Sequence, residues 1–166
     1  MANSKDSKSL LDLSTLQSLK DLRIALVYTE WNEQIVAEQL NGFNKIASAL
    51  NIRVTDKVMV PGCVEIPFAC KQLWETHKKR YYVPEAIIAF GAVIQGGTPH
   101  FDYVCKAVSE GITQLNLLLP IPVIFGVLTL NNEEQAWERL GGVHGHKGEE
   151  AAITACKMIA LNRKLQ

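Results

Sequence analysis

GAVIQGGTPHFDYV, residues 91–104, is the stretch that decides the fold, because it joins the end of a strand to the start of a helix. The apolar run just before it, residues 86–90, is typical of a buried strand. Gly96 and Gly97 then permit a tight turn that side chains would obstruct. A helix follows with Thr98 as N-cap and Pro99 at its first position, and its predicted apolar face consists of Phe101, Val104, Cys105, Val108 and Ile112.

This helix start also predicts an anion site with a proton-transfer group beside it. Unpaired backbone N–H groups and the positive end of the helix dipole converge near Gly97 and Thr98, where a phosphate is stabilised. The same dipole disfavours imidazolium, so a largely neutral His100 suits general acid–base catalysis near pH 7. The alternative is an ordinary glycine turn and a capped helix with an exposed histidine. Local chemistry alone leaves both interpretations open.

Strands and helices alternate on both sides of this stretch. The hydrophobic pattern predicts strands at residues 24–28, 54–60, 86–90 and 122–128. A helix is expected after each strand, with a further helix at the C-terminus, and these helices begin near Asn32, Pro67, Thr98, Glu133 and Gly148. The alternation indicates an α/β fold: a single-domain three-layer sandwich with a four-stranded parallel sheet and right-handed crossovers.

The chain divides into a predicted N-terminal arm, residues 1–22, and a folded domain, residues 23–166. The first nine residues are polar, but the leucines after them give the arm more apolar character than a linker needs. We therefore expect this part of the arm to pack against something; the leucines are Leu10, Leu11, Leu13, Leu16 and Leu19.

Length and composition limit the function classes. A chain of 166 residues with 48% hydrophobic content suffices for one domain with a sizeable core. Its 17 basic and 17 acidic residues cancel, which argues against a nucleic-acid partner. No apolar run approaches the roughly 20 residues needed to cross a bilayer, and the first residues lack the apolar core of a signal peptide. We therefore expect no membrane partner and a cytoplasmic location.

The cysteines and histidines form no recognisable metal motif. The four cysteines contain no CxxC pair, and free thiols are expected at Cys63, Cys70, Cys105 and Cys156. Cys63 lies in a predicted loop, where a nucleophilic role is the less favoured alternative. His144 and His146 form an HxH pair without a third ligand at suitable spacing, so we expect solvated loop histidines and no metal.

Three predicted loops converge at one edge of the sheet. Ligands of α/β proteins bind beyond the carboxyl ends of the parallel strands. Trp31 and Asn32 follow the first strand, residues 63–65 the second, and residues 96–100 the third. A binding site is therefore expected at that edge.

The order and spacing of these motifs resemble the 6,7-dimethyl-8-ribityllumazine synthase family of riboflavin biosynthesis. The resemblance extends from about Arg23 to the C-terminus. It rests on WN at residues 31–32, PGCVEIP at 61–67, GGTPHFDYV at 96–104, PVIFGVLT at 122–129, EQAWER at 134–139 and KG at 147–148. It implies the flavodoxin-like lumazine synthase fold for residues 23–166.

The resemblance implies an enzyme, a transferase without cofactor or metal. In this family the amine of 5-amino-6-(D-ribitylamino)uracil condenses with the carbonyl of 3,4-dihydroxy-2-butanone 4-phosphate. Phosphate then leaves, and the second ring closes to give 6,7-dimethyl-8-ribityllumazine and water. Carried over by motif, His100 is the catalytic residue that moves protons, Gly97, Thr98 and Arg139 bind the phosphate, and Lys147 assists near it.

The other implied residues contact the pyrimidine and the ribityl chain. Trp31 stacks on the flat heterocycle, and the backbone around Val64 together with Glu65 hydrogen-bonds the ribityl chain. Phe125 reaches into a neighbour's site. The remaining positions of this substrate-binding set are Asn32, Cys63, Ala92, Val93 and Ile94.

Each of these roles has a purely structural alternative. Arg139 suits a helix C-terminus, Glu65 a helix N-terminus, and Trp31 and Phe125 a hydrophobic core. Lys147 equally suits a solvated loop.

The chain also departs from the commoner family pattern at four positions. Gln95, Leu130, Leu140 and His146 stand where arginine, threonine, alanine and asparagine are frequent. Gln95 removes a cation near the glycine turn, and His146 beside Lys147 suggests a more pH-sensitive phosphate end.

The resemblance further implies a homo-oligomer, because Phe125 completes a neighbouring site only in an assembly. Pentamers are implied, and a sixty-subunit icosahedral shell is favoured by two features. The segment at residues 140–148 lacks the extra residues of pentameric members, and residues 1–20 contain no proline to stop pairing with a neighbour's sheet edge. An association with riboflavin synthase stays open.

Two rival functions remain on the same fold. One is a flavin-binding or shell-forming protein without activity, and the other is a riboflavin synthase that uses two lumazine molecules. The joint presence of His100, Arg139 and Lys147 favours the lumazine synthase reaction.

Overall fold

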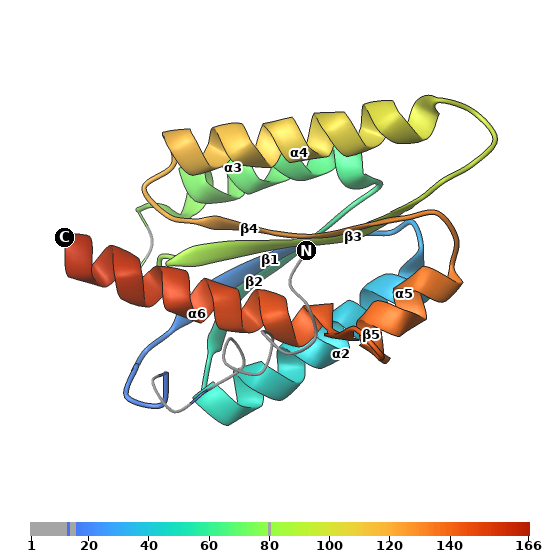
Figure 1. Cartoon of the computed structure of the whole chain (residues 1–166). Helices are drawn as coiled ribbons and strands as arrows, with labels where there is room; N and C mark the ends of the chain where they lie inside the picture. Colours follow the sequence, from blue (N-terminus) through green and yellow to red (C-terminus); the bar gives the residue numbers. More distant parts are fainter. Residues whose placement is uncertain (1–12, 14–15, 80) are drawn as a thin grey trace.

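The computed structural model describes Leu13, residues 16–79 and residues 81–166 (Figure 1). Strands and helices alternate along the chain as the hydrophobic pattern predicts. The elements are β1 (Arg23–Thr29), α2 (Glu33–Leu50), β2 (Arg53–Val60), a 3₁₀ turn η1 (Cys63–Glu65), α3 (Ile66–His77), β3 (Ala86–Ile94), α4 (His100–Leu118), β4 (Val123–Leu130), α5 (Glu134–Arg139), β5 (Leu140–Gly142), β6 (Gly145–His146) and α6 (Lys147–Leu165).

The main sheet has four parallel strands in the order β2-β1-β3-β4. The central strands β1 and β3 are apolar and mostly buried because helices cover both of their faces. Strand β2 lies at one edge and is more polar and more exposed. This arrangement confirms the predicted α/β sandwich with a four-stranded parallel sheet.

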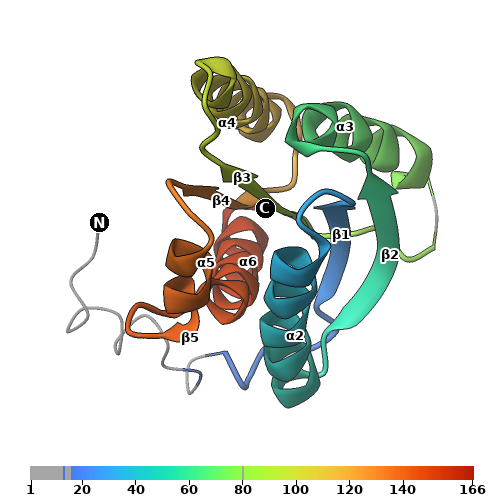
Figure 2. The same cartoon turned by 90° about the vertical axis from the view of Figure 1, so that its right-hand side faces the viewer.

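Helices cover the sheet in two layers, which Figures 1 and 2 show from two sides. Helices α3 and α4 lie on one face, and α2, α5 and α6 lie on the other. Each layer encloses its own core: Phe43, Phe90 and Ile159 belong to the α2–α6 core, and Val108 and Ile112 to the α3–α4 core. Each face of the sheet thus packs against one layer of helices.

Two helix starts differ from the sequence prediction. Thr98 does not cap α4; Pro99 occupies the N-cap position, makes no side-chain cap, and α4 begins at His100. Asn32 stands at the N-cap of α2, but its side chain does not bond the helix. Its amide instead bonds a neighbouring strand, so a tertiary contact has replaced the local cap.

The leucine segment before β1 packs onto the core, as the sequence predicts. Leu16 is buried in the α2–α6 core, and Leu13 and Leu19 pack against it. Leu10 and Leu11 lie outside the described residues. The expected pairing of residues 1–20 with a neighbour's sheet edge falls largely outside them too and stays a prediction.

Within the described part of the chain, no helix is both long enough and apolar enough to cross a membrane. The four cysteines are free thiols.

Candidate active site

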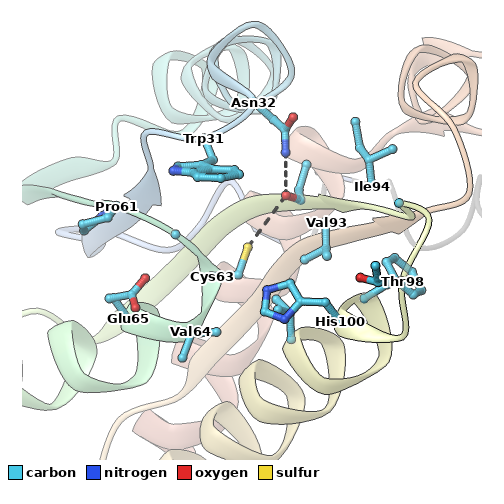
Figure 3. A pocket seen from close by; sticks show the side chains of 15 residues that line it. Trp31, Asn32, Pro61, Cys63, Val64, Glu65, Val93, Ile94, Thr98 and His100 are labelled. Carbon is cyan, nitrogen blue, oxygen red and sulfur yellow. Dashed lines mark hydrogen bonds between the residues drawn. The ribbon is translucent and has the colours of Figure 1, made fainter.

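A cavity of about 640 Å³ lies beyond the carboxyl ends of β1, β2 and β3, where the three loops converge (Figure 3). Its volume is within the usual range for a small-molecule site. The lining residues come from the three predicted loops and from the start of α4; they are Trp31, Asn32, Pro61, Gly62, Cys63, Val64, Glu65, Ala92, Val93, Ile94, Gly96, Thr98, His100, Phe101 and Val104. The lining therefore contains most of the predicted site residues.

The turn after β1 presents Trp31 to the cavity. The residue is 74% exposed, so it is not a core aromatic. Asn32 adopts a left-handed conformation with φ of 60°, which asparagine tolerates better than most residues. The Asn32 side chain donates a hydrogen bond of 2.9 Å to the carbonyl of Ala92 on β3. This bond joins the turn to the centre of the sheet and leaves the Trp31 ring free at the cavity.

Cys63 is a buried thiol that shares the same acceptor. Its Sγ atom lies 3.9 Å from the Ala92 carbonyl oxygen, to which it donates. Burial, aided by the nearby Cys105 and Glu65, raises the pKa of the Cys63 thiol to about 12. A thiol with this pKa is not a nucleophile near neutral pH, which argues against that alternative role.

Val64 and Glu65 follow in the 3₁₀ turn that precedes α3. Val64 is about half exposed, and Glu65 is exposed at the mouth of the cavity. A Cβ at Gly62 would lie 3.2 Å from the Glu65 carboxylate, so the glycine leaves that carboxylate room. Figure 3 shows Val64 and Glu65 beside Cys63 on the side of η1.

The glycine pair after β3 is open rather than crowded. Gly96 and Gly97 are exposed, and a Cβ at either position would meet no atom within 4 Å. Neither glycine has a positive φ. The expectation that side chains would obstruct this turn is therefore wrong for the chain itself, and any need for glycine here comes from what approaches the loop from outside.

His100 begins α4 and turns its imidazole into the cavity (Figure 3). The side chain is exposed, and among the described residues none hydrogen-bonds its ring. Val93 on β3 lines the same cavity (Figure 3). The arrangement offers a free ring nitrogen for proton transfer opposite a flat aromatic surface.

Four predicted residues are not part of the cavity lining: Gly97, whose two neighbours in sequence do line it, and three residues that lie elsewhere. Phe125 on β4 is 43% exposed, and together with Lys147 it lines a second hollow of about 490 Å³ on the β4–α6 side. Arg139 at the end of α5 donates to the Gln135 carbonyl at 3.1 Å and lies 3.7 Å from the Glu138 carboxylate. One chain therefore does not bring these last three residues together with His100.

The sequence analysis missed four residues of the cavity lining. Pro61 and Gly62 belong to the quoted PGCVEIP motif, which was the available signal. Phe101 and Val104 were assigned to the core face of their helix, but both are only half-buried and line the cavity. A residue at the boundary between core and site satisfies the apolar helical pattern in either role.

His146 also differs from expectation. Whereas His144 is about half exposed, the His146 side chain is only 13% exposed and contacts Glu38. It is therefore not a solvated loop histidine. Among the described residues, no group of three or more His, Cys, Asp or Glu side chains is placed to hold a metal ion.

The comparisons with known proteins agree with one another. The family model described as 6,7-dimethyl-8-ribityllumazine synthase matches residues 21–163. The 6,7-dimethyl-8-ribityllumazine synthase of Porphyromonas gingivalis is 44% identical over 168 residues, covering 98% of this chain and 99% of its own. That of Parabacteroides distasonis is 39% identical over 161 residues, with 96% and 98% covered. That of Cytophaga hutchinsonii is 44% identical over 147 residues, with 87% and 89% covered. Family model, relatives and fold coincide over nearly the whole length, and the chain belongs to the 6,7-dimethyl-8-ribityllumazine synthase family.

Proposed function

We propose that the protein condenses 5-amino-6-(D-ribitylamino)uracil with 3,4-dihydroxy-2-butanone 4-phosphate at a site that two copies of the chain build together. The reaction is that of its family, in riboflavin biosynthesis. The observation that supports the shared site is the separation of the cavity with His100 from the face that carries Phe125 and Lys147.

The cavity suits the pyrimidine substrate. A flat heterocycle stacks on the exposed Trp31 ring, and the strand end at Ala92 to Ile94 supplies backbone groups along its edge. The ribityl chain extends toward Val64 and Glu65, whose carboxylate accepts hydrogen bonds from its hydroxyl groups. Asn32 and Cys63 support this wall through their shared acceptor on β3.

His100 moves the protons of the condensation. Its ring accepts a proton from the attacking amine, returns one to the oxygen that leaves as water, and assists the loss of phosphate that follows. The open loop at Gly97 and Thr98 leaves room for phosphate oxygens beside the first turn of α4. The phosphate thus lies next to the residue that carries the protons.

A second copy supplies the other half of the site. Phe125 covers the bound heterocycle, and Arg139 and Lys147 neutralise the phosphate from the neighbour's side. We propose a heterologous contact, in which the cavity of one copy meets a different surface of the next, with a rotation that closes the copies into a ring. We propose the pentameric ring implied by the family, and a sixty-subunit shell above it. The cytoplasmic location and the association with riboflavin synthase stay predictions.

Subunit mixing tests the shared site directly. His100→Ala leaves Phe125, Arg139 and Lys147 intact, and Arg139→Ala leaves the cavity intact. When the two weak variants are co-assembled in equal amounts, about a quarter of the interfaces join two intact halves. At low butanone phosphate the mixture should therefore recover roughly a quarter of the native rate. If the rate of the mixture were no greater than the mean rate of the two separate variants, the shared site would be contradicted.

Two further measurements separate the rivals. Formation of lumazine from the two substrates, with a parallel dismutation assay on lumazine alone, distinguishes this enzyme from a riboflavin synthase and from an inactive flavin binder. Sedimentation of the purified protein gives its mass. A mass near five chains would contradict the shell, and a mass near one chain would contradict the shared site as well.

A further inference from the structure

His146 lies between helices α2 and α6, directly before Lys147. It occupies the N-cap position of α6, and its Nδ1 atom accepts a hydrogen bond of 3.2 Å from the backbone N–H of Gly148. Lys147 is the first residue of that helix. The ring therefore bonds the first turn of the helix whose first residue is the proposed phosphate lysine.

The hydrogen bonds locate the proton of this imidazole. A ring nitrogen that accepts carries no proton, so in the neutral ring the proton is on Nε2. Nε2 lies 3.3 Å from a carboxylate oxygen of Glu38 on α2 and donates to it. Hydrogen bonds from Asn41 and His146 lower the pKa of the Glu38 carboxyl group. A charged carboxylate on α2 thus holds the ring that caps α6.

Two glycines make room for this contact. A Cβ at Gly42 on α2 would overlap the Cε1 and Nδ1 atoms of the His146 ring. A Cβ at Gly148 would overlap the backbone carbonyl of Gln39, also on α2. A glycine in the middle of a helix costs stability relative to alanine. The His146 ring fills the space that a side chain at position 42 would need, which explains the glycine there.

His146 is also tied to the segment that carries Arg139. In the short hairpin of β5 and β6, His146 pairs with Leu140. Arg139 immediately precedes Leu140 and Lys147 immediately follows His146, so both proposed phosphate cations flank this one pair. The contact between His146 and α2 therefore affects the end of α5, which carries Arg139, and the start of α6, which carries Lys147.

We propose that His146 is a positioning residue for phosphate binding, which acts by holding Lys147 and the β5–β6 hairpin against α2. The proposal rests on the proposed function, since it assigns a support to the phosphate end of that site. The ring itself does not touch substrate. Four other charged side chains beside His146 pair with one another. Lys45 on α2 bonds Glu149 at 2.8 Å, and Lys147 bonds Glu150 at 2.6 Å.

Steady-state kinetics on four variants test the proposal. His146→Ala should raise KM for 3,4-dihydroxy-2-butanone 4-phosphate by about three- to tenfold, the scale of a lost N-cap, and leave kcat within about twofold. His146→Asn should restore KM only in part, because the asparagine oxygen can accept from the Gly148 N–H but the shorter side chain loses the ring's bond to Glu38. Lys147→Ala should raise the same KM. In the Lys147→Ala background, His146→Ala should raise KM by a clearly smaller factor, because only the part of its effect that passes through the hairpin and Arg139 remains.

The outcomes distinguish the two levels of the argument. An unchanged KM in Lys147→Ala would overturn the proposed role of the lysine and the inference with it. A raised KM in Lys147→Ala but not in His146→Ala would overturn the inference alone. The inference would also be overturned if His146→Ala had the same effect with and without Lys147, because that would mark a general structural role.

Gly42→Ala provides a second test that leaves both His146 and Lys147 in place. The added Cβ displaces the ring, so KM should rise as in His146→Ala, although alanine by itself favours the helix. Combined with His146→Ala, the substitution should raise KM by less than it does in the native background, because the overlapping ring atoms are gone and the tight contact that remains is with the Glu149 amide nitrogen at 3.0 Å. A native KM in a folded Gly42→Ala protein would contradict the proposal, even if His146→Ala failed to fold.

Discussion

The cavity wall and the β4–α6 face are built in different ways. In the wall, bonds join residues far apart in sequence: Asn32 and Cys63 both donate to the carbonyl of Ala92. The two proposed phosphate cations, Arg139 at the end of α5 and Lys147 on the β4–α6 face, instead bond near neighbours: Arg139 bonds the Gln135 carbonyl and Lys147 bonds Glu150. The wall is therefore organised by the chain's own tertiary structure, whereas the two cations, within the described part of the chain, bond only near neighbours in sequence, as expected of groups that act on another copy.

The largest effect is expected where the cavity carries its chemistry. His100→Ala should lower kcat by roughly 10²- to 10⁴-fold, because the proton transfers lose their acid–base group. Steady-state kinetics measure the loss, and thermal unfolding checks that the fold is intact. His144→Ala is the matched control, since that exposed histidine lies outside the cavity. Native turnover in His100→Ala would remove the residue from the mechanism.

The next effect concerns Arg139, which lies outside the cavity at the end of α5. Arg139→Ala should raise KM for the butanone phosphate by roughly 10- to 100-fold with a smaller change in kcat, because a guanidinium binds phosphate oxygens with two charged hydrogen bonds. Arg139→Lys should lie between, since it keeps the charge but loses the planar fork. If KM were native in Arg139→Ala, the side chain would have only its observed contacts at the end of α5.

Substitutions at two glycines compare a position inside the packed protein, Gly91, with a position on the open loop, Gly97. A Cβ at Gly91 would lie 2.8 Å from the Cys63 Sγ and 3.1 Å from Thr29 Cγ2, whereas one at Gly97 meets nothing within 4 Å. Gly91→Ala should therefore destabilise the fold by about 1–3 kcal/mol, and Gly97→Ala by less than about 0.5 kcal/mol. Thermal unfolding compares the two. Gly97→Ala should instead raise KM for the phosphate substrate, and the opposite pattern would contradict the proposed phosphate loop.

The smallest effect is expected at Cys63. Because burial raises its pKa to about 12, the folded protein keeps it as an uncharged thiol near pH 8. Iodoacetamide should modify it more slowly than the half-buried Cys105, as mass spectrometry of digested protein can show. The unfolded thiol ionises near its ordinary pKa of 9.0, so the free energy of unfolding should fall as the pH rises above that value. Rapid modification of Cys63 in folded protein would contradict the prediction that it stays an uncharged, buried thiol.

Much of the candidate site could be predicted because its residues follow strand ends. Trp31, Cys63 and His100 each lie just after a strand or a turn that the apolar pattern marks. Details that depend on distant partners could not be predicted. Asn32 looks like a helix cap in sequence, but it bonds Ala92, which lies 60 residues away. His146 looks like a solvated loop residue, but it fills the space left by Gly42.

By itself the sequence determined the five main helices and the four strands of the parallel sheet, though not the short β5–β6 hairpin, because hydrophobic periodicity and turn residues act over a few neighbouring positions. It also placed the chemistry-bearing loops at one edge of that sheet. Only the tertiary structure decided which of these residues share a cavity. His100 and Trp31 do, whereas Arg139 and Lys147 do not. The physical reason is that a contact between distant residues depends on how two helices approach, and that distance is set by the packing of both layers at once.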